Sequence, residues 1–174
     1  MDDVRIVPTE ERYAERFNAV VGSVARERRY IGFVDAPSLE STRQFLRSIV
    51  AGAGVQFLAV TQADTVVGWC DIVRNSLEGF RHVGRLGMGL LPDYRGRGLG
   101  RELVVRALEG AWQAGIERVE LEVFASNERA IALYRTLGFL TEGIKRSARK
   151  LDGRYEDNVF MALLRREENA ANAV

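Results

Sequence analysis

Arg95-Gly96-Arg97-Gly98-Leu99-Gly100 is the stretch of this 174-residue sequence that decides its fold. It lies between an apolar, strand-like segment at 84–91 and a helical pattern that begins near Leu99. Glycine at three of these positions leaves backbone N–H groups unshielded by side chains. The helix that follows begins with unpaired N–H groups and the positive end of its dipole. The stretch therefore predicts an anion cradle, and a pyrophosphate is the ligand that suits it best.

The spacing of the glycines separates this cradle from two other nucleotide-binding motifs. A dinucleotide-binding G-x-G-x-x-G that begins at Gly96 would need glycine where Arg101 stands. A P-loop would end in Lys-Ser or Lys-Thr, which is absent here. What remains is Arg-x-x-Gly-x-Gly at 95–100, with the cations Arg97 and Arg101 beside it. Taken alone, this pattern also fits a glycine-rich turn that only joins a strand to a helix.

Composition limits the classes of protein to which this chain can belong. Hydrophobic residues make up 47% and charged residues 28% of the sequence, and the net charge of +1 gives no field that would attract nucleic acid. The single cysteine, Cys70, excludes an internal disulfide. One cysteine and one histidine, His82, do not make a standard zinc site, so no metal is expected. Without a long apolar run or a signal-peptide core, a cytoplasmic protein with no membrane partner is expected.

Hydrophobic periodicity predicts one domain over 1–164 and a frayed tail over 165–174. The expected strands are 4–7, 57–61, 65–73, 84–91, 118–124, 139–151 and 155–164, and the expected helices are 10–25, 39–51, one from Leu99 to a stop at Gly115, and one after Asn127. Gly87 and Gly89 suggest a bulge, or close approach of a ligand, in their strand. Asp152-Gly153 favours a type I′ hairpin turn. This order implies an α/β (α+β) fold, a mixed sheet with helices on both faces.

A second motif follows the strand expected at 118–124. The segment 127–139, Asn-Glu-Arg-Ala-Ile-Ala-Leu-Tyr-Arg-Thr-Leu-Gly-Phe, has the form N-x-x-A-x-x-x-Y-x-x-x-G-F. Its defined positions are Asn127, Ala130, Tyr134, Gly138 and Phe139. Together and in this order, the cradle and this segment resemble the two signatures of the GNAT N-acetyltransferases. The resemblance covers about 84–143, and it implies the GNAT fold with a mostly antiparallel central sheet and acetyl-CoA as co-substrate.

The resemblance assigns a cofactor site residue by residue. The strand backbone that pairs with the pantetheine arm corresponds to Met88, Gly89 and Leu90. The pyrophosphate cradle corresponds to Gly96, Arg97, Gly98, Leu99, Gly100 and Arg101, and a further cofactor contact corresponds to Asn127. Arg95 has two interpretations, because it can touch phosphate or hold the turn through backbone carbonyls.

The resemblance also assigns two catalytic residues: Tyr134 as the general acid for the leaving thiolate and Glu122 as the general base for the amine. An amine with a pKa near ~10 must lose a proton before attack, and a carboxylate can accept it. Asp71 and Glu78 are the alternative carboxylates, and Glu122 can instead be a cross-strand charge partner. Tyr134 can instead be a core aromatic, or a hydrogen-bond donor to sulfur, because a tyrosine is a weaker acid than a thiol. A bulge near Gly89 would free N–H groups for the oxyanion.

Two segments of the sequence bear on the identity of the acceptor. Residues 122–139 resemble the ribosomal-protein alanine N-acetyltransferases, whereas 152–157 resemble the acetyltransferases of amino acids and related small amines. We expect a small-molecule primary amine such as an amino acid. The alternatives are a protein N-terminus or lysine, and a module that binds acyl-CoA without turnover. The candidates for lining the acceptor pocket are Arg29, Tyr30, Phe33 and Tyr155. Neither nucleic acid nor membrane is expected as a partner, and homodimers are frequent in the family.

Overall fold

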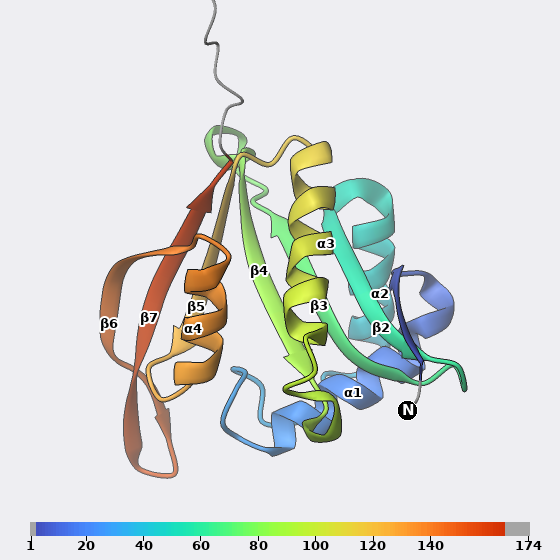
Figure 1. The fold of residues 1–174 in the computed structure, drawn as a ribbon, viewed down its shortest axis with the longest axis horizontal. Coiled ribbons are helices and arrows are strands. Elements are labelled where there is room, and N and C mark those ends of the chain that lie inside the picture. Colours follow the sequence, from blue (N-terminus) through green and yellow to red (C-terminus); the bar gives the residue numbers. More distant parts are fainter. Residues whose placement is uncertain (1–2, 166–174) are drawn as a thin grey trace, which may run out of the picture.

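The computed structural model describes residues 3–165, which form a seven-stranded sheet with the order β1-β2-β3-β4-β5-β7-β6 (Figure 1). The strands are β1 (Val4–Pro8), β2 (Gly54–Thr61), β3 (Val66–Arg74), β4 (Val83–Leu90), β5 (Arg118–Phe124), β6 (Leu140–Leu151) and β7 (Arg154–Leu164). Neighbouring strands are antiparallel except for β4 and β5. This confirms the mixed, mostly antiparallel sheet. The fraying expected for 165–174 concerns positions outside the described residues, apart from Arg165.

Helices cover both faces of the sheet, as predicted. They are α1 (Ala14–Arg26), α2 (Leu39–Ser48), α3 (Leu99–Gln113) and α4 (Glu128–Thr136), with shorter helical turns η1 (Glu11–Tyr13), η2 (Ile49–Ala53), η3 (Glu78–Phe80) and η4 (Pro92–Tyr94). In Figure 1, α3 and α4 lie in front of the sheet, and α1 and α2 lie behind it. Each pair of helices closes its own hydrophobic core against the sheet. Within residues 3–165, no helix combines the length and the apolar character that crossing a membrane requires.

Strand β4 differs from the prediction. Its pairing with β3 runs without a shift from Gly68 opposite Leu90 to Arg74 opposite Gly84, so the bulge expected near Gly89 is wrong. The glycine has a steric reason instead, because a Cβ at Gly89 would lie 2.3 Å from the ring of Trp69. Glycine in β4 therefore makes room for β3 side chains on the face that α1 covers.

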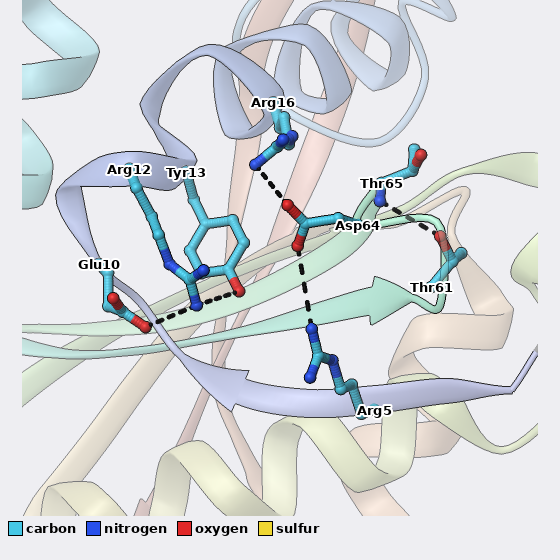
Figure 2. Close-up of polar contacts among 8 residues, drawn as sticks. All are labelled: Arg5, Glu10, Arg12, Tyr13, Arg16, Thr61, Asp64 and Thr65. Carbon is cyan, nitrogen blue, oxygen red and sulfur yellow. Dashed lines mark hydrogen bonds and ion pairs between the residues drawn. The ribbon is translucent and has the colours of Figure 1, made fainter.

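Polar contacts fix α1 to the edge of the sheet (Figure 2). Asp64, in the turn between β2 and β3, lies 2.8 Å from the guanidinium of Arg16 on α1 and 3.9 Å from that of Arg5 on β1. Arg12 donates to the hydroxyl of Tyr13, a residue with no exposed surface. From this fixed start, α1 runs across the sheet and contacts β3 and β4.

Candidate active site

The sheet opens between β4 and β5. Their parallel pairing joins Val83–Arg85 to Arg118–Glu120 and then stops. Figure 1 shows the two strands diverging toward the loop that leads into α3. Beyond this point β4 pairs only with β3, and β5 pairs only with β7. The space between the two halves is called the wedge below.

One edge of the wedge carries free backbone groups. The N–H of Leu91, directly after β4, donates to the carbonyl of Val67 at 2.9 Å and so points toward β3. Successive residues of a strand direct their backbone groups to opposite sides. Gly89 therefore also faces β3, whereas Met88 and Leu90 face the wedge. Among residues 3–165 no strand pairs with this edge, so it can bind an extended chain that carries amide groups.

The glycine cradle lies at the end of this edge. Gly98 is the N-cap of α3, has φ 84°, and no side chain caps the helix. A Cβ at Gly98 would meet no atom within 4 Å, so the space before the first turn of N–H groups is open. Gly96 also has a positive φ, 79°. At Gly100, a Cβ would lie 3.4 Å from Cε of Met88, so the cradle and the free edge are neighbours.

Arg95 holds the turn between β4 and α3. Its Nε donates to the carbonyl of Leu90 at 2.9 Å, and its Nη atoms pair with both carboxylate oxygens of Glu27. Its guanidinium also stacks over the ring of Tyr30 at 4.6 Å. These contacts support the structural interpretation of Arg95, and its contact with phosphate stays a prediction.

Three other arginines surround the cradle. Arg97 and Arg101 are exposed, and the guanidinium of Arg97 lies 5.5 Å from the ring of Tyr94. Arg129, in the first turn of α4, places Nη2 only 2.7 Å from the position of a Cβ on Gly96. No prediction from the sequence named Arg129. Arg129 stands two residues after the helix cap Asn127, within the motif at 127–139, and this position could have indicated a contact with the cradle.

The second motif forms α4 as expected. The Oδ1 atom of Asn127 accepts the N–H of Ala130 at 3.2 Å and caps the helix, which leaves the amide N–H groups of Asn127 for other partners. Tyr134 is 5% exposed, and its ring packs 5.6 Å from that of Phe139. Burial, with the thiol of Cys70 nearby, raises the pKa of Tyr134 above its usual range. Its hydroxyl therefore keeps its proton and suits hydrogen-bond donation better than full proton transfer.

The predicted base, Glu122, is an ion-paired carboxylate on β5. Its oxygens lie 2.6 Å from Nζ of Lys145, 3.2 Å from Arg85 and 3.0 Å from Nδ2 of Asn158. Burial acts to raise its pKa, but these three contacts outweigh burial and place the pKa below the usual value. This environment resembles the cross-strand charge partner considered above, and the role of Glu122 as base stays a prediction.

The two alternative carboxylates have different surroundings. Asp71 is half-buried on β3, opposite Gly87, and burial raises its pKa to about 7, with Gln56 and Trp69 acting in the opposite direction. Glu78 is exposed on η3, which lies between β3 and β4. The connection leads into Val83–Arg85, the part of β4 that pairs with β5. Asp71 is therefore the alternative that lies nearer the wedge.

A cavity of about 880 Å³ lies between the end of α1, the end of β5 and the β6–β7 hairpin. It is lined by Glu27, Arg28, Arg29, Ala125, Ser126, Arg149, Leu151, Asp152, Arg154, Tyr155, Glu156 and Asp157. Of the four residues predicted to line an acceptor pocket, Arg29 and Tyr155 line this cavity, and Tyr30 and Phe33 do not. The hairpin turn has positive φ at Asp152 and Gly153, which fits the predicted type I′ geometry. A 2.8 Å ion pair joins Asp152 to Arg28.

Comparison with curated proteins links the chain to two kinds of amine acylation. It is 42% identical over 72 residues to the [Ribosomal protein bS18]-alanine N-acetyltransferase of Escherichia coli (strain K12). That alignment covers 41% of this chain and 49% of the relative, so the chain spans about half the length of the relative. It is 28% identical over 123 residues to the L-amino acid N-acyltransferase MnaT of the same organism, covering 70% of this chain and 72% of MnaT.

Solved structures agree on the fold. A GNAT-family acetyltransferase from Streptococcus pneumoniae matches with a TM-score of 0.87 and 26% identity, over 93% of this chain and 99% of that one. The structure of yncA, a putative acetyltransferase from Salmonella typhimurium with its cofactor acetyl-CoA, matches with a TM-score of 0.88 and 19% identity over 99% of both chains. Residues 18–139 match the sequence model of the Acetyltransferase (GNAT) family. The wedge, the cradle and these matches agree, and the chain belongs to the acetyltransferase (GNAT) family of enzymes.

Proposed function

We propose that this enzyme transfers the acetyl group of acetyl-CoA to the primary amine of a small molecule, such as an amino acid, within one ternary complex. The observation that carries the proposal is that three features are neighbours: the open cradle at Gly98 adjoins Gly100, and Gly100 adjoins the side chain of Met88, whose backbone faces the wedge. A helix N-terminus suits a pyrophosphate, and an unpaired strand edge suits the amides of a pantetheine arm. Both curated relatives are named for the acylation of amines.

Each of these features has a role when the co-substrate supplies its activated acetyl group. N–H groups of the first turn of α3 would hold the pyrophosphate, with charge from Arg97, Arg101 and Arg129. Backbone groups of Met88 and Leu90 would pair with the arm, and Asn127 would contribute an amide donor. The protonated hydroxyl of Tyr134 would donate to the sulfur as it leaves.

The cavity beside the β6–β7 hairpin would receive the acceptor. Its volume of about 880 Å³ lies within the usual range for small-molecule sites. The ion pair between Arg28 and Asp152 joins the hairpin to the end of α1, which favours a small acceptor over a folded protein. A protein N-terminus is the second candidate, because the 42% identical relative is named for the alanine of a ribosomal protein. A cytoplasmic location and a homodimer stay predictions.

The test is thiol release from acetyl-CoA with a panel of amino acids, polyamines, aminoglycosides and N-terminal peptides. We expect turnover with a free amino acid or a close analogue. Turnover of peptides alone would support the second candidate. Binding of acetyl-CoA without turnover of any amine would support the non-catalytic module. Replacing the cavity residue Arg29 by alanine should raise KM for the acceptor and leave KM for acetyl-CoA unchanged.

A further inference from the structure

We propose that Asp71, and not Glu122, takes the proton from the acceptor amine. This inference rests on the acetyl transfer proposed above. It follows from the position of Asp71 in the sheet, from the absence of a side chain at Gly87, and from the ion pairs that engage Glu122.

The side chains of Asp71 and Tyr134 lie on opposite faces of the sheet, at the same point along β3. Cys70 and Asp71 are consecutive on β3, so their side chains emerge on opposite faces. Cys70 is paired with Met88 and lies near Tyr134 in the core under α3 and α4. Asp71 is paired with the next residue of β4, Gly87, and emerges on the other face. The group for the leaving sulfur and the group for the incoming nitrogen would thus be kept apart.

Gly87, the β4 residue paired with Asp71, places no side chain over its carboxylate. A Cβ on Gly87 would lie 3.3 Å from Oδ1 and 3.6 Å from Oδ2 of Asp71, so both oxygens sit over the backbone of β4. At Gly89, the next residue on this face, the ring of Trp69 fills the space that a side chain would take. The wedge begins at the other edge of β4, about one strand spacing or 4.8 Å away. An amine in the wedge can reach the carboxylate directly or through one water.

The groups that face Asp71 from the neighbouring elements leave it without a charged partner. Gln56 lies opposite it on β2 and is 2% exposed, and its amide and the Trp69 side chain act to lower the pKa of Asp71 without overcoming the effect of burial. Trp69 is its neighbour on β3. The core under α1 on this face is apolar, with Phe17, Val21 and Val24. The nearest cation along β4, Arg85, is paired with Glu122.

This environment suits a proton acceptor better than that of Glu122. Burial places the pKa of Asp71 at about 7, so the carboxylate can take a proton and release it near neutral pH. The ion pairs of Glu122 with Lys145 and Arg85 stabilise its charged form and weaken it as a base. The Arg85–Glu122 pair instead joins β4 to β5 where the wedge begins.

The proton and bond changes balance as follows. The carboxylate of Asp71 takes one proton from the ammonium group, which frees the nitrogen lone pair. A C–N bond forms at the thioester carbon and the C–S bond breaks. The nitrogen then loses its second proton, and the thiolate gains one with the assistance of the Tyr134 hydroxyl. Asp71 returns its proton to solvent, so the net products are the amide, the thiol and one proton.

The test compares Asp71→Asn, which keeps the size of the side chain, with Glu122→Gln and with Glu78→Gln as the matched control on η3. Values of kcat are measured from about pH 5 to 9 at a saturating concentration of an amine with a pKa near ~10, which stays mostly in its ammonium form over this range. Wild type and both glutamate variants should show an acidic limb near pH 7. Asp71→Asn should lose the limb and about 10²–10⁴-fold in kcat, with unchanged affinity for acetyl-CoA.

A second variant covers the case in which asparagine disturbs folding. Asp71→Ala should be inactive and should regain rate with added formate, which replaces the missing carboxylate. A limb that persists in Asp71→Asn, or one that disappears in Glu122→Gln, overturns the inference while acetyl transfer stands. A wild-type enzyme that turns over no amine overturns the proposed function itself, and this inference with it.

Discussion

Replacing Gly98 by alanine should weaken the binding of acetyl-CoA in addition to lowering stability. The same replacement at Gly115, at the other end of α3, is a control that should lower stability alone. A glycine stands at each end of this helix, with φ 84° at Gly98 and φ 80° at Gly115. A Cβ at either position would meet no atom within 4 Å. The two substitutions therefore impose the same backbone strain without a clash. Only the methyl group at Gly98 would stand before the unpaired N–H groups of the helix.

The size of the strain follows from the backbone angles. A left-handed conformation costs an L-residue about 1–2 kcal/mol relative to glycine. For a domain of this length, each kcal/mol lowers Tm by about 2–4 °C. Gly98→Ala and Gly115→Ala should each lower Tm by roughly 2–8 °C in the absence of ligand.

The assay is thermal unfolding with and without acetyl-CoA. A ligand at about 100 times its Kd stabilises the folded state by about 2.7 kcal/mol. Wild type and Gly115→Ala should both gain this increment, and Gly98→Ala should lose most of it, because the methyl group blocks the approach of the pyrophosphate. Equal increments in the two variants would refute the assignment of the cradle.

Three further outcomes test the site. Tyr134→Phe should lower kcat at least about tenfold and leave acetyl-CoA affinity unchanged, since it removes one donor used in the transition state; unchanged kcat would contradict this. Arg95→Lys should cost about 2 kcal/mol in urea unfolding, because lysine cannot serve both Leu90 and Glu27, whereas the exposed control Arg106→Lys should cost almost nothing. Folding raises the pKa of Asp71 to about 7, so between about pH 4 and pH 7 the folded state binds a proton that the unfolded chain releases. The free energy of unfolding, measured with urea, should therefore fall as the pH rises through this range, and Asp71→Asn should flatten the decline.

The sequence predicted the parts of the site that short segments determine. Gly153 adopts a positive φ in the hairpin turn, and Asn127 caps a helix, because each depends on a few neighbouring residues. The order of strands and helices followed from periodicity for the same reason. The sequence also predicted Tyr134 on the inner face of its helix, since the apolar stripe of that helix was recognisable.

The parts that the sequence could not supply depend on the register between strands. The steric reason for Gly89 requires that Trp69 lie opposite it, which no local pattern states. The partners of Glu122 come from β4, β6 and β7, so its ion pairs exist only once three separate strands are in place. Arg129 reaches the cradle across the contact between α4 and the loop before α3. Tertiary packing sets each of these relations.

The position of β7 has a consequence for biosynthesis. Every residue of β5 pairs with β7, whereas only three pair with β4. The sheet from β1 to β4 can assemble from hairpins and near neighbours as the chain leaves the ribosome. The half of the sheet that contains β5 and Glu122 cannot form until β7, which ends at Leu164, has been synthesised. Before that, β5 has unpaired hydrogen-bonding edges with which another chain can pair. A chain interrupted before β7 would thus hold the loop before α3 and lack the β5–β7 wall of the wedge.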